Sequence, residues 1–151
     1  MEKISHSSDE TKKIGHHIAT TLQGGTILCL YGDLGAGKTT LVKGIAEGLG
    51  ITEDITSPTF TLMNVYNIPS TNKLQTMPTS RQATNLIHID TYRLKNEQEL
   101  VEIGVEDYLG QPGSITIIEW PEKIENLLKN KTVTTITLEH VSGDERKIII
   151  E

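Results

Sequence analysis

The sequence predicts an α/β fold in three layers, with a mixed, partly parallel sheet and a C-terminal β-hairpin. An apolar run, TILCLY (26–31), has the length of a strand and the continuous hydrophobicity of one covered on both faces. A glycine-rich stretch, GDLGAGKTT (32–40), follows it and leads into apolar residues at helical spacing. Near the C-terminus, two strand-like runs flank VSGD (141–144), which is typical of a hairpin.

The first half of the chain contains two predicted helices. Ser7 and Glu10 have the spacing of a capping box, so the first helix is expected to begin near Ser7. Its apolar face would consist of Ile14, Ile18 and Leu22, and the glycine pair 24–25 would end it. The second helix follows the glycine-rich stretch, presents an apolar stripe over 41–49 and ends at Gly50.

The second half alternates strand-like runs with polar segments. In chain order we first expect strand-forming residues after Pro58 in TSPTFTLMNVYNI (56–68) and then an exposed, mobile loop over 69–85. A strand in LIHIDTYRL (86–94) and a short acidic helix in EQELVEIGVEDYL (97–109) follow. The last predicted elements are a buried strand in SITIIEW (114–120), stopped by Pro121, and the hairpin strands TVTTITLEH and RKIIIE.

Composition limits the kinds of protein this can be. A length of 151 residues suits a single domain over 1–151. The net charge of -6 argues against a chain that coats nucleic acid by electrostatics alone, although a partner could supply a basic surface. The single cysteine, Cys29, lies in the apolar run and is expected to be a buried core residue. No stretch has the length of a membrane helix and the N-terminus has no apolar signal region, so the sequence predicts a cytoplasmic protein with no membrane partner.

The glycine-rich stretch matches the phosphate-binding pattern G-x-x-x-x-G-K-[ST] at Gly32, Gly37, Lys38 and Thr39. Such glycines let successive backbone N–H groups point at phosphate oxygens, and the following helix N-terminus adds partial positive charge. A glycine turn with an exposed lysine is the alternative, but a strand before and a helix after favour the phosphate cradle. The pattern therefore predicts a P-loop NTPase-like domain whose nucleotide-binding residues include Gly32, Asp33, Leu34, Gly35, Ala36, Gly37, Lys38, Thr39 and Thr40.

Two acidic residues end predicted strands. Asp90 follows LIHI and Glu119 follows SITII, and open α/β sheets bind ligands at such strand ends. Each acid alone is better explained as a solvated carboxylate. With two of them in a chain that has a phosphate loop, we expect at least one to serve magnesium.

Three other residues leave their roles open on the sequence alone. Ser57 is pushed toward an extended conformation by Pro58, and a strand entry is the preferred interpretation. His88 alternates with isoleucines and is expected to pack or cap rather than catalyse. Trp120 could stack on a base or a partner, or fill the edge of the sheet.

Four segments in this order, GDLGAGKTTL, SPTFTL, HIDTYRL and IIEWPEKI, resemble the TsaE family of small P-loop ATPases, which are required for the threonylcarbamoyladenosine modification of tRNA. The resemblance covers nearly the whole chain. It implies ATP and Mg²⁺ as cofactors, with Lys38 on the phosphates and Thr39, Asp90 and Glu119 at the metal. It also implies catalytic roles for Lys38, Asp90 and Glu119, a switch-like segment at Thr59, a partner-facing Trp120 and a base-proximal Ser8.

The resemblance further implies partners and a mechanism. A heterodimer of TsaD and TsaB would bind this chain, ATP hydrolysis would reset that complex between rounds, and tRNA would be met only indirectly through the complex. Two features depart from the family pattern: the 69–85 segment looks long, and Thr91 stands where many relatives have an aliphatic residue. Neither is expected to touch the nucleotide motifs.

Two other functions remain open on the sequence. A small kinase that phosphorylates a metabolite usually needs an arginine-rich lid, whereas the arginines here, Arg81, Arg93 and Arg146, fall in three separate segments. A nucleotide-dependent binding module with incidental hydrolysis is the other, and the short length of the chain and the lack of a substrate domain favour keeping it.

Overall fold

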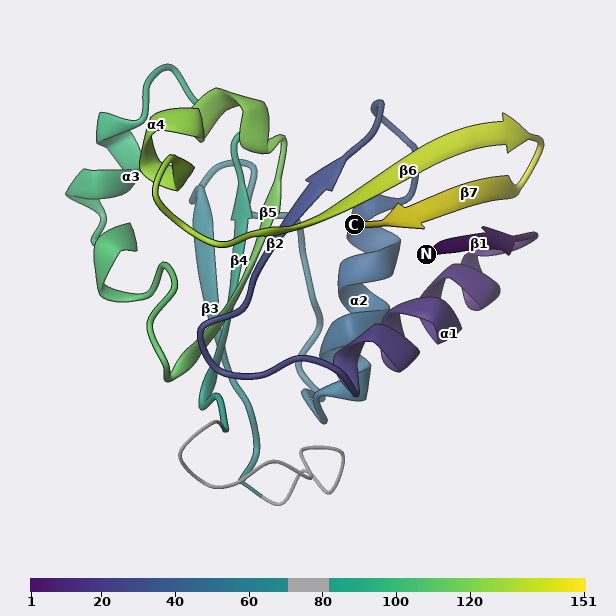
Figure 1. The fold of residues 1–151 in the computed structure, drawn as a ribbon, viewed down its shortest axis with the longest axis horizontal. Helices are drawn as coiled ribbons and strands as arrows, with labels where there is room; N and C mark the ends of the chain where they lie inside the picture. Colours follow the sequence, from purple (N-terminus) through teal and green to yellow (C-terminus); the bar gives the residue numbers. More distant parts are fainter. Residues whose placement is uncertain (71–81) are drawn as a thin grey trace.

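A computed structural model describes residues 1–70 and 82–151, whose strands form one sheet. The sheet has seven strands in the order β1-β7-β6-β2-β5-β4-β3 (Figure 1). The strands are β1 (Glu2–Ser5), β2 (Ile27–Tyr31), β3 (Met63–Asn67), β4 (Asn85–Asp90), β5 (Ser114–Glu119), β6 (Thr134–Ser142) and β7 (Glu145–Ile150). Parallel pairing joins β6, β2, β5 and β4, while β1, β7 and β3 pair antiparallel. The predicted mixed sheet and terminal hairpin are confirmed.

Helices cover both faces of this sheet (Figure 1). On one side lie α1 (Ser8–Ala19) and α2 (Lys38–Gly48); on the other lie the short α3 (Gln98–Glu102) and α4 (Glu125–Leu128), with the 3₁₀ turns η2 (Val105–Asp107) and η3 (Pro121–Ile124). Strand β2 shows why three layers form, since Leu28 and Leu30 belong to one buried apolar cluster while Ile27 and Cys29 belong to the other. Burial raises the pKa of the Cys29 thiol to about 11, as expected for a core cysteine.

Helix α1 begins as predicted but ends early. The Ser7 side chain accepts a hydrogen bond from the Glu10 amide at 3.1 Å. Glu10 in turn accepts from the amide of His6 at 2.7 Å, which completes the cap one residue before the expected position. The hydroxyls of Thr20 and Thr21 donate to helix carbonyls and end the helix at Ala19, so Leu22 packs in the core from the following turn.

Three further expectations need correction. The segment 97–109 is not one helix, because Gly104 at φ 84° separates α3 from η2. Strand β3 is shorter than the 56–68 run and begins only at Met63. Most of the predicted 69–85 loop lies outside the described residues, but its end is not exposed loop: Ala83 is buried and β4 already begins at Asn85.

Strand β1 was not predicted. It lies at the edge of the sheet beside β7, and the Met1 amino group donates to the carbonyl of Ile150. Its four residues show too little alternation to be distinguished from a polar tail. In the part of the chain that the structure describes, no helix is long and apolar enough to cross a membrane.

Helices α1 and α2 pack at backbone contact distance, which gives a first prediction. A Cβ on Gly44 would lie 2.2 Å from the carbonyl oxygen of Lys12 and 2.7 Å from its Cα. We expect Gly44→Ala to lower the free energy of unfolding by about 1–3 kcal/mol, despite the roughly 1 kcal/mol that alanine adds to helix propensity. Denaturant unfolding measures this. Gly113→Ala is the control, since its Cβ would meet nothing closer than 3.6 Å; an equal loss in both variants would contradict the prediction.

Candidate functional site

The glycine-rich loop connects the end of β2 to the start of α2. Gly37 takes the left-handed conformation, φ 100°, and acts as the N-cap of α2, so the helix begins at Lys38. A cavity of about 510 Å³ opens beside the loop. It is lined by Leu34, Gly35, Ala36, Gly37, Lys38, Thr39, Thr40, Ser57, Thr59, Asp90, Tyr92, Arg93, Glu119 and Trp120.

Lys38 is held inside the loop. Its Nζ donates to the carbonyls of Gly32 at 2.5 Å and Asp33 at 3.0 Å, and lies 3.9 Å from the centroid of the Trp120 ring. Burial lowers the pKa of Lys38, while the negative charges of Glu119 and Asp90 oppose that shift. These contacts hold the Lys38 ammonium at the N-terminus of α2, where the partial positive charge of the helix favours phosphate oxygens.

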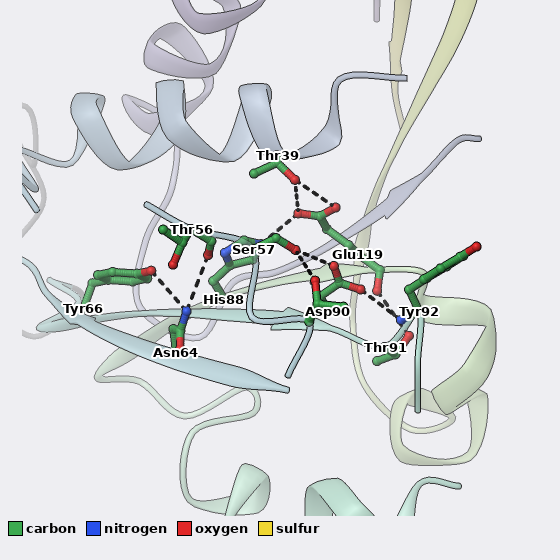
Figure 2. Close-up of polar contacts among 11 residues, drawn as sticks. Thr39, Thr56, Ser57, Asn64, Tyr66, His88, Asp90, Thr91, Tyr92 and Glu119 are labelled. Atoms are coloured by element: carbon green, nitrogen blue, oxygen red, sulfur yellow. Dashed lines mark hydrogen bonds and ion pairs between the residues drawn. The ribbon is translucent and has the colours of Figure 1, made fainter. Parts of the chain in front are cut away.

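The two predicted acids project toward the α2 side of the sheet. Asp90 and Glu119 are register partners at the ends of the parallel strands β4 and β5. Alternation along these strands puts them on the same face as Leu86 and Ile117, which belong to the apolar cluster under α1 and α2. The strand ends therefore bring both carboxylates to the N-terminus of α2, as Figure 2 shows.

Glu119 contacts the start of α2 directly. The Thr39 hydroxyl donates to Oε1 at 3.1 Å and approaches Oε2 at 3.4 Å. On its other side, Oε1 lies 2.8 Å from Nε2 of His88 (Figure 2). Glu119 is therefore nearly buried, with hydrogen-bond donors on two sides.

Asp90 connects the site to a different segment. Its Oδ2 accepts from the Ser57 hydroxyl at 2.6 Å, and its Oδ1 accepts from the Tyr92 amide at 2.9 Å. Ser57 also lies 3.3 Å from the hydroxyl of Thr59. The interpretation of Ser57 as a strand entry is wrong, because it lies in the loop before β3 and binds the acid.

Trp120 adopts an unusual backbone conformation at the cavity wall. Its φ of 62° and ψ of 48° are left-handed, which costs a non-glycine residue on the order of 1–3 kcal/mol. The Thr91 hydroxyl donates to its carbonyl at 2.5 Å, and the Tyr92 ring lies 5.0 Å away. The expectation that Thr91 stays clear of the nucleotide motifs is wrong, since its hydroxyl also lies 3.2 Å from the backbone carbonyl of Glu119 and can donate to it.

The sequence of this chain matches the model of a known family. The family model "Threonylcarbamoyl adenosine biosynthesis protein TsaE" matches residues 5–148. The chain belongs to the TsaE family.

Individual proteins of this family align with this chain over most of their length. The tRNA threonylcarbamoyladenosine biosynthesis protein TsaE of Treponema pallidum (strain Nichols) is 37% identical over 150 residues, which cover 99% of each chain. The protein of that name from Bacillus subtilis (strain 168) is 39% identical over 93% of this chain and 78% of its own. The crystal structure of Bacillus subtilis YdiB superposes with a TM-score of 0.72, at 31% identity, over 98% of this chain and 82% of that one.

In this TsaE-family chain most of the predicted site residues meet in one place. The loop from Leu34 to Thr40, both acids, Thr59 and Trp120 line the same cavity. Gly32 and Asp33 contribute through their carbonyls to Lys38. Ser8 does not line that cavity, but it lies in an adjoining one of about 90 Å³ that shares Gly35, Gly37 and Thr40 with it and is also lined by Thr11, Asp144 and Arg146.

Several contributors to the TsaE-family site were missed or undervalued. Tyr92 and Arg93 line the cavity, and the spacing of HIDTYRL gave no reason to choose them. His88 was expected only to pack or cap, yet it contacts Glu119. Of the three arginines, Arg93 and Arg146 line the two cavities, and Arg81 lies outside the described residues.

The oxygen donors beside the loop fit magnesium. The Thr39 hydroxyl and the Glu119 carboxylate lie within 3.4 Å of each other and are hard ligands of the kind Mg²⁺ prefers. Among the described residues, no group of three or more His, Cys, Asp or Glu side chains could hold a metal by itself. Mg²⁺ commonly takes one or two protein ligands and completes its shell with phosphate oxygens and water.

Proposed function

We propose that this chain binds ATP with magnesium in the loop cavity, hydrolyses it, and through that cycle acts on a TsaB–TsaD heterodimer in the threonylcarbamoyladenosine modification of tRNA. The observation that supports this most strongly is the convergence of Lys38 and Thr39, at the start of α2, with Glu119 and Asp90 at two parallel strand ends. Family membership supports the pathway.

Each residue has a chemical part in this proposal. The loop amides and the α2 N-terminus donate to phosphate oxygens, and Lys38 offsets their charge. Thr39 and Glu119 would hold magnesium, which supplies further charge neutralisation on the phosphates when bound. Asp90 fixes Ser57 and the backbone of Tyr92 at the cavity wall through its two carboxylate oxygens. This makes Asp90 the connection between the nucleotide and the SPTF segment.

Exposed apolar side chains at the cavity rim support the proposal that a partner protein binds there. Phe60 is 86% exposed and Leu34 is 74% exposed, and Tyr92 is also exposed. The guanidinium of Arg93, which lines the cavity, lies 5.0 Å from the Phe60 ring. Aromatic residues and arginine are enriched at protein interfaces. A partner docked on this rim would sense the nucleotide, and the net charge of -6 favours contact with tRNA only through that partner.

Co-purification with TsaB and TsaD, with and without ATP, tests the proposal. We expect the heterodimer to be retained and to accelerate phosphate release. Phe60→Ala should weaken retention by about 30-fold, the effect of losing an interface residue worth ~2 kcal/mol, without loss of stability. Val141→Ala is the control, because this exposed side chain lies in the β6–β7 hairpin, among residues that do not line the cavity. If the Phe60→Ala variant retains the heterodimer as strongly as the wild type does, the rim is not the surface that binds the partner.

The same assay separates the two alternatives. Transfer of the γ-phosphate to a metabolite instead of water would identify a kinase. Nucleotide-dependent retention of the heterodimer with no release of inorganic phosphate would identify a binding module.

A further inference from the structure

His88 lies directly beneath the Glu119 carboxylate. Its side chain is fully buried, and that of Glu119 is only 4% exposed. The 2.8 Å contact between His88 Nε2 and Glu119 Oε1 joins neighbouring strands, β4 and β5, on the face that meets α2 (Figure 2). His88 is thus a buried polar residue of the sheet, and it contacts Glu119, the acid that also contacts Thr39.

The surroundings of the ring select one tautomer. An ionised carboxylate only accepts hydrogen bonds, so Nε2 carries the proton in this contact. Nδ1 is buried and has no hydrogen-bond partner among the residues that the structure describes. A ring with a bare Nε2 would instead point its lone pair at the carboxylate oxygen across the 2.8 Å contact, where both atoms can only accept. The 2.8 Å contact therefore makes His88 a donor to Glu119 through Nε2–H.

The hydrogen bond also restricts how the carboxylate can turn. Oε1 has donors from both His88 and Thr39, whereas among residues 1–70 and 82–151 Oε2 has only the longer 3.4 Å approach of Thr39. Burying a carboxylate without hydrogen-bond donors would cost several kcal/mol, so the side chain would rotate toward another donor. With Oε1 held by both donors, the carboxylate is fixed against Thr39 at the start of α2.

We propose that His88 is a positioning residue that donates through Nε2–H to Glu119 and presents the charged carboxylate to the metal side of the cavity. This rests on the proposed function, because it assigns Glu119 to magnesium. Side chains that hold a metal-binding carboxylate in this way typically change metal affinity or activity 10–100-fold when replaced.

The test uses two replacements of nearly equal size. His88→Gln keeps an amide N–H that can reach Oε1, and His88→Met removes the donor while filling the space among apolar neighbours. Binding of a non-hydrolysable ATP analogue to the full chain is measured by calorimetry in magnesium and in EDTA. We expect magnesium to tighten binding for the wild type and for His88→Gln, and His88→Met to lose about 10-fold or more of that gain. Affinities in EDTA should agree within about 2-fold.

The outcomes separate this inference from the function it rests on. A folded His88→Met variant that keeps the whole magnesium gain, or a His88→Gln variant that loses as much as His88→Met, overturns the positioning role. A wild type whose binding does not respond to magnesium overturns both the role and the proposed function. If neither variant folds, ¹⁵N spectra of the wild-type histidines decide: a protonated Nε2 on His88 supports the role, and a bare Nε2 overturns it.

Discussion

Lys38→Ala is expected to lower ATP turnover by at least about 100-fold while the chain stays folded. The Lys38 ammonium lies at the N-terminus of α2, in the cavity that both carboxylates also line. Removing one preorganised charge that stabilises a transferring phosphoryl group typically costs 10²–10³-fold in rate. The measurement is steady-state release of inorganic phosphate, with thermal unfolding of the same preparation to establish that the variant folds.

Stability should change little in this variant. The hydrogen bonds of Nζ go to the carbonyls of Gly32 and Asp33, which form the concave loop and can accept from water once the lysine is gone. Lys43→Ala on the same helix is the matched control, because this side chain does not line the loop cavity; turnover within about 2-fold of the wild type is expected. A folded Lys38→Ala chain with full turnover would contradict the assignment of the phosphate loop.

The phosphate loop and both acids could be predicted because their signals are local. The loop pattern needs only the spacing of Gly32, Gly37, Lys38 and Thr39, and each acid needs only an apolar strand before it. Parallel pairing of β4 and β5 then brings Asp90 and Glu119 together without further information, since the carboxyl ends of parallel strands lie at one edge of the sheet.

The supporting contacts could not be predicted, because they depend on distances between segments far apart in the chain. Alternation places His88 on the same face as Asp90, but only the register between β4 and β5 brings it to Glu119, 31 residues away. Ser57 reaches Asp90 across 33 residues, from a loop with no periodicity. Thr91 binds the carbonyl of Trp120 because Trp120 turns left-handed before a proline, a conformation that no propensity favours.

The local errors have a common physical cause. Propensity and periodicity describe which residues suit a helix, not where its last hydrogen bond goes. Thr20 and Thr21 bond back to the carbonyls of α1 and end it before the apolar stripe does. Gly104 interrupts the segment after α3 through its backbone, by taking a left-handed conformation that a helix cannot continue.

Glu119→Gln is expected to raise the magnesium concentration needed for half-maximal turnover by about 10–100-fold and to lower the maximal rate. Glutamine preserves the size of the side chain and one acceptor oxygen, but it removes the charge that a hard divalent cation requires. Glu119 is the acid in contact with Thr39, the hydroxyl that the loop pattern assigns to the metal. Nucleotide affinity in EDTA should change far less, since the loop amides and Lys38 remain.

Asp90→Asn is the matched comparison, because it removes the same charge from the neighbouring strand end. Both oxygens of Asp90 are already engaged, Oδ2 by Ser57 and Oδ1 by the amide of Tyr92. We therefore expect Asp90→Asn to lower turnover, through the SPTF segment, with a smaller shift in the magnesium requirement than Glu119→Gln. Magnesium titrations of phosphate release for the two variants decide between the acids. If Asp90→Asn shifts the requirement and Glu119→Gln does not, the metal role belongs to Asp90, and the contact between Thr39 and Glu119 must serve to hold the loop against the sheet.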